Sequence, residues 1–165
     1  MSKYERKIVD NGEVVGFLGC EFSNFYYCNF YLNGLNFKNS EQAFMYCKAK
    51  LFRDEEIAEL ILKNPDPKKC KSLGRKVKGF NEDKWNEKKE DYMYIILKSK
   101  FNSDDKLKSM LLKTDNKLIA ECSPFDKEWG IGIGVDDMLY GVRWNGDNKL
   151  GKCLMKVRDY LKESN

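Results

Sequence analysis

The chain has 165 residues, of which 42% are hydrophobic and 34% charged, a composition of globular rather than disordered proteins. Its net charge of +4 is mild and its lysines are interspersed with acids, so the sequence predicts no dedicated nucleic-acid stripe and leaves a local basic patch open. No window is apolar over a membrane-spanning length, and the first six residues contain no apolar run. We therefore expect a cytoplasmic protein without a signal peptide or membrane partner, folded as one domain over residues 1–165.

The residue types that are absent narrow the chemistry. The chain contains no histidine, which excludes imidazole-based zinc sites and nucleophiles of the Ser-His or Cys-His kind. Proton transfer in an enzyme would then fall to Asp, Glu, Lys, Tyr or Cys, with carboxylates the natural candidates. The six cysteines form no Cys-x-x-Cys pair, so we expect free thiols in a reducing cytosol. Neither a metal ion nor a cofactor is expected.

The first half of the chain predicts short strands followed by helices. Asn33-Gly34 supplies the positive φ angles of a tight turn, which favours a hairpin from Phe30 to Phe37. Ser40 is suited to cap a helix that runs to about Lys50. Three further elements are expected: a strand at 14–18, a helix at 54–63, and a short helix capped by Asp66 that ends at Gly74.

The second half predicts mainly helices. The longest begins at Asn81 or Asp83 and ends at about Phe101. The pattern then indicates a helix at 104–113, a strand at 117–122, a loop at 135–146 and a final amphipathic helix that starts near Leu150. Because helices dominate and the strands are short, the fold class is α+β: a mostly helical single domain with a small antiparallel β-hairpin or sheet.

A glycine-rich segment follows the strand expected at 117–122. Pro124 ends that strand, Asp126 and Trp129 follow, and Gly130, Gly132 and Gly134 then alternate with apolar residues. This order places a carboxylate and an indole at the mouth of a loop whose backbone can approach a ligand closely. The alternative is a glycine-rich turn in which Trp129 anchors the core.

A second informative stretch is the helix that begins near Ser40. Glu41 and Lys48 are seven residues apart, so both lie on one stripe of the helix with apolar residues between them. Charges at both ends of an apolar stripe suggest a site in a buried face. The alternative is that Glu41 only complements the helix dipole while Lys48 extends its ammonium group into water.

Four other positions are candidates for binding. The segment Phe22 to Tyr26 is either a pocket loop or a turn pinned by its aromatic residues. Arg75 follows a helix end and suits phosphate or solvent, and Trp85 suits base stacking or core packing. Asn148 is placed to cap the last helix, whose first amides would then be available to an anion.

Taken in order, these motifs resemble the NADAR family, also called YbiA-like, over about residues 17 to 161. The matching elements are Phe22-Ser-Asn-Phe25, Ser40-Glu41-x6-Lys48, Gly74-Arg75, Trp85, Lys100-Phe101, Leu111-Leu-x-Thr114, Asp126-x-x-Trp129-Gly-x-Gly132 and Asn148-x-Leu-Gly151-x-x-Leu-Met155-x-x-Arg158. The resemblance implies a YbiA-like fold and an N-glycosidase, a hydrolase that cleaves the bond between ribose C1′ and a nitrogen. Substrates described for the family are ADP-ribose attached to guanine in nucleic acid and phosphorylated ribosylaminopyrimidine intermediates of riboflavin synthesis.

The resemblance also implies roles for individual residues. Glu41 would be the principal acid or base, Asp126 would orient the ribose or water, and Lys48 would keep Glu41 ionised or contact phosphate. Carboxylates suit a reaction that passes through an oxocarbenium-like state. The implied binding residues are Ser23, Asn24, Phe25, Arg75, Trp85, Trp129, Gly130, Gly132 and Asn148, with either tryptophan stacking on the leaving base.

Two departures from the family pattern bear on substrate choice. The YbiA-type branch has histidine where this chain has Gln42, and the loop at 133–146 is longer. The net charge of +4 and Gln42 favour ADP-ribosylated nucleic acid over the phosphorylated ribosyl small molecule. Readings from other classes remain open: a module that binds ADP-ribose or a nucleotide without cleaving it, and an interaction protein with an aromatic core.

Overall fold

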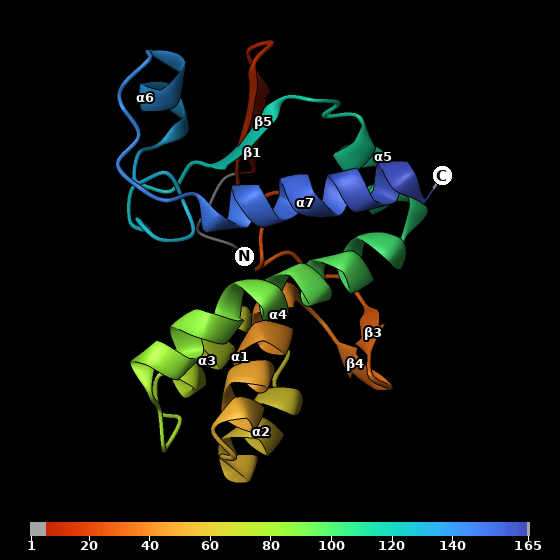
Figure 1. Ribbon diagram of the computed structural model, residues 1–165, viewed down its shortest axis with the longest axis vertical. Helices are drawn as coiled ribbons and strands as arrows, with labels where there is room; N and C mark the ends of the chain where they lie inside the picture. The colour runs from red at the N-terminus through yellow and green to blue at the C-terminus, as the bar shows by residue number, and fades with distance from the viewer. Residues whose placement is uncertain (1–5, 165) are drawn as a thin grey trace. The chain divides into compact units, whose positions relative to one another are not determined.

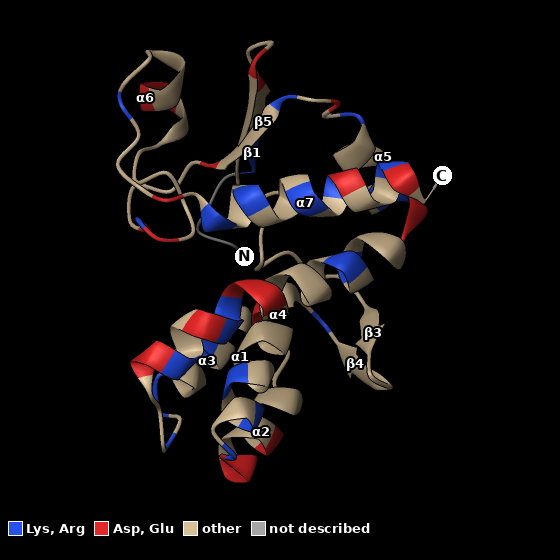
Figure 2. Ribbon diagram, viewed as in Figure 1, with Lys and Arg blue, Asp and Glu red and all other residues tan. Residues whose placement is uncertain are grey.

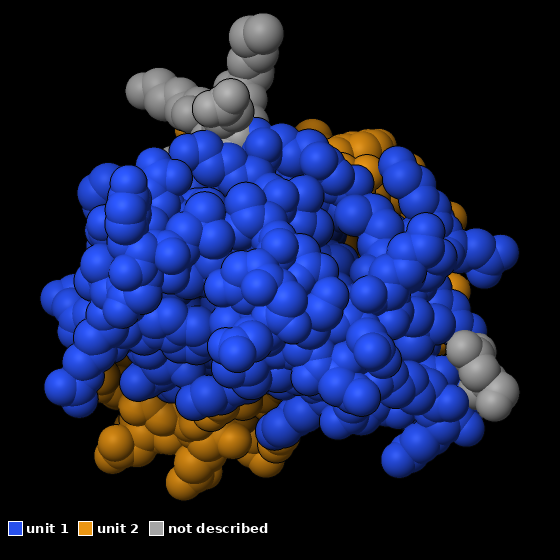
Figure 3. All heavy atoms as spheres, turned by 90° about the horizontal axis from the view of Figure 1, so that it is seen from above, with its two compact units in different colours: residues 1–23, 104–165 blue, residues 24–103 orange. Residues whose placement is uncertain are grey.

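The computed structural model describes residues 6–164 (Figure 1). The segment 1–5, on which the expectation of no signal peptide rests, lies outside the described residues. The chain divides into two compact units, shown in different colours in Figure 3. Residues 24–103 form the first, here called the inserted unit, and the chain before and after them forms the second, here called the terminal unit.

A mixed three-stranded sheet organises the terminal unit. Its strands are β1 (Lys7–Asp10), β2 (Val14–Leu18) and β5 (Leu118–Glu121), in the order β1-β2-β5. β1 runs antiparallel to β2, whereas β5 runs parallel to β2 with Val14 opposite Leu118. The predicted strands at 14–18 and 117–122 are confirmed. The strand β1 and the parallel pairing were not predicted.

Three helices accompany this sheet: α5 (Asp105–Leu112), α6 (Val135–Leu139) and α7 (Lys149–Glu163). α7 packs along β5 and against α5, and α6 packs on β2. The prediction of a loop throughout 135–146 is wrong over its first part. Val135 and Met138 are three residues apart and both are buried against Ala120 and Cys122, so core packing stabilises a short helix there.

The inserted unit holds a hairpin and four helices. β3 (Phe30–Leu32) pairs antiparallel with β4 (Leu35–Phe37), and the turn residues Asn33 and Gly34 have φ angles of 50° and 78°, which confirms the hairpin. The helices are α1 (Ser40–Leu51), α2 (Glu55–Leu62), α3 (Pro67–Gly74) and α4 (Glu82–Asn102). α1 packs against each of the other three helices.

The predicted helix ends agree with the structure to within about one residue, and the predicted cap of α1 is corrected. Asp54, Asp66, Asn81 and Asp104 each cap the helix that follows them with a side-chain oxygen. α1 is capped by Asn39 and not by Ser40, because the Asn39 side chain accepts the backbone N–H of Gln42. The predicted class, a mostly helical α+β fold with small sheets, is confirmed. Among residues 6–164, no helix has the length and apolar character needed to cross a membrane.

Candidate active site

Glu41 lies in the first turn of α1, inside the inserted unit. Residues 40–45 are all buried, because α1 is surrounded by α2, α3 and α4. Glu41 is only 8% exposed, and its backbone N–H donates to the carbonyl oxygen of Asn24 at 3.0 Å. Two of the predicted site residues, Asn24 and Glu41, are therefore held together by the backbone. An ionisable group in such a position carries a desolvation cost that surface glutamates avoid.

Lys48 lies two turns further along the same helix and interacts electrostatically with Glu41. Burial lowers the pKa of Lys48, the Glu41 carboxylate opposes that shift, and the cations Arg75 and Lys89 reinforce it. The Lys48 ammonium nitrogen lies 4.7 Å from the centre of the Phe80 ring and 5.8 Å from that of Trp85. Such distances allow cation–π attraction. The alternative in which Lys48 only extends into water does not describe this arrangement.

Trp85 belongs to α4 and is 8% exposed. Its ring contacts Phe44 at 5.0 Å and Tyr92 at 6.2 Å between ring centres. These contacts match the core-packing interpretation, while the distance to Lys48 places the same ring beside the charged groups. Stacking of Trp85 on a leaving base stays a prediction.

Lys48 lies near the Glu41 carboxylate and near two further cations. Arg75, at the C-cap of α3, and Lys89 both act on the pKa of Lys48, so all three cations lie near one another in the inserted unit. Figure 2 shows the Lys and Arg residues of α1, α3 and the connection into α4 as blue bands in this unit. Cations beside a buried carboxylate suit an anionic substrate.

Lys89 was not predicted as a site residue. It is 6% exposed and lies four residues after Trp85 and four before Met93, on the buried stripe of α4. A lysine at an apolar position of a helix was the available signal. The pattern was hidden because α4 carries charged residues on most of its surface.

Two buried polar atoms belong to residues that adjoin Glu41, one in the chain and the other through a backbone hydrogen bond. Among the described residues, Asn24 Oδ1 and Ser40 Oγ are buried and have no hydrogen-bond partner. Ser40 precedes Glu41, and Asn24 accepts the Glu41 backbone N–H. Buried polar groups are usually satisfied, so both atoms are candidates to bind hydroxyl groups of a substrate.

The thiols near this site are poor nucleophiles. Burial raises the pKa of Cys47 to about 11, and burial together with the Glu41 charge raises the pKa of Cys70 to about 12. Both groups are therefore protonated at neutral pH, and the thiolate is the reactive form. Within residues 6–164, no group of three or more cysteine or acidic side chains is placed to hold a metal ion.

The side chain of Gln42, next to Glu41, is held by hydrogen bonds to backbone groups. Its Oε1 atom accepts the backbone N–H of Lys38 at 2.7 Å, and its Nε2 atom donates to the carbonyl oxygens of Ile61 at 3.0 Å and Asn64 at 2.9 Å. The side chain thus joins the start of α1 to the end of α2. This network explains a glutamine at the position without any contact to substrate.

The Lys48 environment makes a prediction for the pH dependence. The pKa of Lys48 is lowered, whereas an exposed lysine has a pKa of about 10.4. As the pH rises, Lys48 therefore loses its charge before an exposed lysine does. If the cation is required, kcat/KM falls along an alkaline limb that reports this pKa. Lys48→Arg should move the limb to higher pH, since guanidinium stays charged beyond about pH 12.

The matched control is Lys50→Arg on the same helix, where the wild-type lysine is exposed and pairs with Glu55 at 2.7 Å. Lys50→Arg should leave the limb in place. Lys48→Met should lower activity across the whole pH range. A Lys48→Arg profile that superimposes on wild type would show that Lys48 does not titrate in the reaction.

The glycine-rich loop lies in the terminal unit. Asp126 Oδ1 accepts the backbone N–H groups of Glu128 at 3.0 Å and Trp129 at 2.8 Å, so Asp126 shapes the turn that presents Trp129. A Cβ atom at Gly130 would come within 2.9 Å of the Asp126 carbonyl oxygen, and one at Gly132 would collide with the backbone of Asn145. The loop's own backbone therefore accounts for both glycines. Phosphate binding by their amides stays a prediction.

The remaining predicted positions flank the boundary of the two units. Ser23 is half-buried in the terminal unit, and its backbone N–H donates to the carbonyl of Cys20 at 2.8 Å in a tight turn. Phe25 is half-buried in the inserted unit. The turn interpretation of this segment is therefore correct for Ser23. Substrate binding by these residues is untested and stays a prediction.

Asn148 does not cap α7 with its side chain, contrary to the prediction. It has a left-handed backbone with φ of 55°, its Nδ2 atom donates to the Ile119 carbonyl at 2.8 Å, and its Oδ1 atom accepts the Glu121 N–H at 3.2 Å. The side chain extends the edge of β5 instead. A Cβ at Gly151 would collide with the Ile119 carbonyl and the Asn148 side chain, so α7 begins in close contact with this strand.

We expect Asn148→Ala to destabilise the protein by about 2–4 kcal/mol, because two buried backbone groups lose their partner at a cost of about 1–3 kcal/mol each. Urea unfolding monitored by circular dichroism measures the change. Asn116→Ala, at an exposed turn position, is the control. If Asn148→Ala unfolds at the wild-type midpoint and instead loses substrate affinity, Asn148 acts on the ligand.

Comparison with known proteins identifies the family. The sequence model of the NADAR domain matches residues 18–162, close to the span of 17 to 161 expected from the motifs. The chain belongs to the NADAR family. Its relatives include N-glycosidase R617 of Acanthamoeba polyphaga mimivirus, which is 39% identical over 84% of this chain and 85% of that protein.

Two further comparisons place this NADAR protein. The riboflavin biosynthesis protein VVA0006 of Vibrio vulnificus is 30% identical over 86% of this chain and 35% of that protein. The NMR structure of the Escherichia coli protein YbiA superimposes with a TM-score of 0.77 at 27% identity, covering 94% of this chain and 89% of YbiA. The expected YbiA-like fold is confirmed.

Proposed function

We propose that this NADAR protein hydrolyses the C1′–N bond that links ADP-ribose to guanine in nucleic acid. The broader class, a hydrolase acting on N-glycosyl compounds, is shown by the N-glycosidase relatives. The observation that carries the proposal is the buried Glu41 carboxylate that interacts with Lys48, together with the cations Arg75 and Lys89 and the Trp85 ring near that lysine. This set supplies one acid or base, charge for phosphates and a stacking surface.

The proposed reaction needs only groups of this chain and water. The C1′–N bond breaks with its electron pair on the leaving nitrogen, which takes up a proton from a water molecule, and the ribose passes through an oxocarbenium-like state. Glu41 stabilises that positive charge and takes a proton from the water that adds to C1′. The proton that Glu41 accepts returns to the solvent after the reaction. Lys48 keeps Glu41 ionised, because its positive charge lies on the same stripe of α1.

Other side chains would bind and orient the substrate. Ser40 Oγ and Asn24 Oδ1 lack partners among the described residues and would bond to ribose hydroxyls. Trp85 or Trp129 would stack on guanine, a contact worth about 1–3 kcal/mol in single-strand binders. Asp126 would orient the ribose or the water, and the Gly130 and Gly132 amides would bind phosphate, with Phe25 and Ser23 in the pocket loop.

The phosphates of the nucleic acid favour the ADP-ribosyl adduct over a small phosphorylated molecule. The diphosphate of ADP-ribose and a single phosphate ester each carry about two negative charges at neutral pH, so the added charge comes from the nucleic-acid strand, which Arg75 and Lys89 beside Lys48 would attract. The second candidate is a phosphorylated ribosylaminopyrimidine, supported by the relative named as a riboflavin biosynthesis protein. Gln42 does not separate the two, since its side chain is occupied by backbone hydrogen bonds. All six cysteines lie within the described residues and none is in a disulfide, which supports the proposal of a location in the reducing cytoplasm.

The test is mass spectrometry of the products that wild-type protein forms from two substrates, ADP-ribosylated guanine DNA and the phosphoribosylaminopyrimidine. Release of ADP-ribose with intact guanine supports the proposal. Release of ribose phosphate from the pyrimidine alone assigns the second candidate instead. Ligand that stays bound and unchanged after overnight incubation would make the protein a binding module.

A further inference from the structure

A pocket opens in the inserted unit where α1 ends and α4 begins. It has a volume of about 340 Å³ and is lined by Leu51, Phe52, Arg53, Gly79, Asn81 and Lys84. This volume falls within the range of about 300–1,000 Å³ typical of small-molecule sites. None of the residues that gave Glu41 its environment lines it, so the pocket is a separate feature of the same unit.

Two residues that line the pocket have positive φ angles. Arg53 has φ of 59° and Gly79 has φ of 74°, and the Phe52 carbonyl oxygen lies 3.5 Å from where a Cβ at Gly79 would be. A left-handed backbone conformation is uncommon for arginine and costs about 1–3 kcal/mol. Proteins retain such strained residues more often at functional sites than elsewhere. This conformation directs the chain so that Arg53 lines the pocket.

The charge of the pocket suits an anion. Arg53 and Lys84 line it, and no acidic side chain does. The adjacent Asp54 is occupied by the backbone N–H groups of Ile57 and Lys78, and Glu55 pairs with Lys50. Glu82 and Asp83 lie in the first turn of α4, outside the lining. Guanidinium and ammonium groups that converge in one cavity bind phosphate well.

An aromatic pair connects this pocket with the candidate active site. The Phe80 ring lies 4.7 Å from the Lys48 ammonium nitrogen and 5.4 Å from the Phe52 ring, so Lys48 and the Phe52 ring are at most about 10 Å apart. Phe80 is 47% exposed, and Lys84 lies 5.9 Å from the Phe52 ring. A substrate whose ribose C1′ reacts beside Glu41 and Lys48 can extend a phosphate chain over Phe80 into the pocket.

We propose that this pocket binds the phosphate next to adenosine in the diphosphate of an ADP-ribosyl group. Through this contact, Arg53 and Lys84 select an ADP-ribosyl group over a 5-phosphoribosyl group. The proposal rests on the proposed function, because it names the part of that substrate remote from the bond that breaks. Asn81 contributes as well, since its Oδ1 atom accepts the Lys84 N–H and its Nδ2 atom remains to donate to the ligand. A phosphoribosyl group has a single phosphate and ends before the pocket.

The experiment compares ligands by isothermal titration calorimetry on the full chain, with ADP-ribose, AMP and ribose 5-phosphate as probes. The variant is Arg53→Asn/Lys84→Gln, because asparagine tolerates positive φ and keeps the backbone unstrained. We expect ADP-ribose affinity to fall about tenfold to a hundredfold, as for loss of hydrogen bonds to charged groups, and much more than ribose 5-phosphate affinity. The affinity for AMP, which contains the phosphate next to adenosine, should weaken together with that for ADP-ribose. Equal weakening of ADP-ribose and ribose 5-phosphate, or of neither, overturns the proposal.

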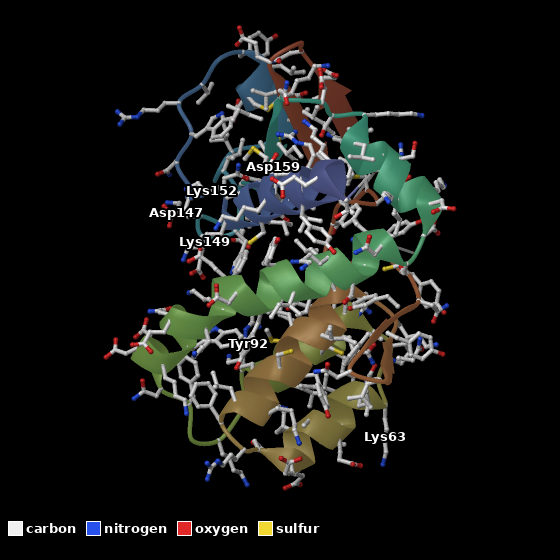
Figure 4. All side chains as sticks on the ribbon, turned by 45° about the vertical axis from the view of Figure 1, so that its right-hand side comes forward. Lys63, Tyr92, Asp147, Lys149, Lys152 and Asp159 are labelled. Carbon is white, nitrogen blue, oxygen red and sulfur yellow. The ribbon has the colours of Figure 1, made fainter. Side chains whose placement is uncertain are left out.

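The matched control is Lys63→Gln, which removes a lysine of the inserted unit whose side chain is 76% exposed and lies at the end of α2 (Figure 4). It should change neither affinity. Arg53→Gly, which also accepts positive φ, repeats the test if the double variant fails to fold.

Kinetics then separate the two proposals. If wild-type protein leaves ADP-ribosylated guanine intact but binds ADP-ribose through Arg53 and Lys84, the proposed function fails and the pocket assignment stands. If wild type cleaves that substrate and the double variant keeps the same ratio of kcat/KM between the two substrates, the function stands and the pocket assignment fails.

Discussion

Glu41→Gln should lower kcat by about 10²–10⁴-fold, the range for loss of a general acid or base. Glutamine keeps the size and hydrogen-bonding shape of the side chain but cannot exchange a proton or stabilise an oxocarbenium ion. Because Glu41 is 8% exposed and couples to Lys48, its carboxylate is the acidic group that α1 places among the cations. Initial rates at saturating substrate measure the effect.

The matched control for this prediction is Glu59→Gln on α2. The Glu59 side chain is 68% exposed and its pairing with Lys63 at 3.5 Å is a surface ion pair, so the control should retain the wild-type rate. Thermal melting and circular dichroism establish that Glu41→Gln is folded. A folded Glu41→Gln protein with wild-type turnover would remove Glu41 from the mechanism.

Gln42→Leu should have the opposite profile, a loss of stability with the chemistry retained. The change leaves the Lys38 N–H without its partner, at about 1–3 kcal/mol. It also removes one of two donors from the Ile61 and Asn64 carbonyl oxygens, which keep the Asn64 N–H and the Cys70 thiol respectively. We expect the free energy of unfolding to fall by about 2–4 kcal/mol, as for other disrupted buried networks. Urea unfolding at 25 °C provides the measurement.

Asn86→Leu at an exposed position of α4 is the control for that substitution and should change stability by less than about 0.5 kcal/mol. The folded fraction of Gln42→Leu should keep the wild-type preference between the two substrates. A shift in that preference, with little loss of stability, would show that position 42 contacts substrate after all. Substitutions at the neighbouring positions 41 and 42 are therefore expected to affect different properties, catalysis at 41 and stability at 42.

The sequence predicted the local elements well because their signals are local. Asp54, Asp66 and Asn81 cap helices through bonds to residues two or three positions away, and Asn33-Gly34 specifies its own turn. Ser40 was predicted to cap α1, whereas the cap is the adjacent Asn39, because both residue types can cap a helix and local sequence does not distinguish them.

Elements that depend on distant partners were missed. β1 is short and mostly exposed, so its residues carry little apolar pattern. The parallel pairing of β2 with β5 joins residues about a hundred positions apart. α6 is stabilised by the packing of Val135 and Met138 on Ala120 and Cys122. No local sequence motif predicts this contact.

The same distinction applies to the candidate site. Glu41 and Lys48 share one helix, so their relation followed from spacing alone. Phe80 and Lys89 join the surroundings of Lys48 only through the packing of α1 against α3 and α4. The structural duties of Gln42 and Asn148 were hidden for the same reason, since their partners lie about 20 to 30 residues away.

The central claim is that water adds to ribose C1′ as the bond to nitrogen breaks. The most direct measurement is mass spectrometry of the products formed from ADP-ribosylated guanine in H₂¹⁸O, with unlabelled ADP-ribose incubated in the same water to correct for exchange at C1′. We expect one ¹⁸O atom in the released ADP-ribose, none in guanine, and release by Glu41→Gln that is slower by about 10²–10⁴-fold. Label in the guanine, or ADP-ribose released without label beyond the exchange control, would contradict it.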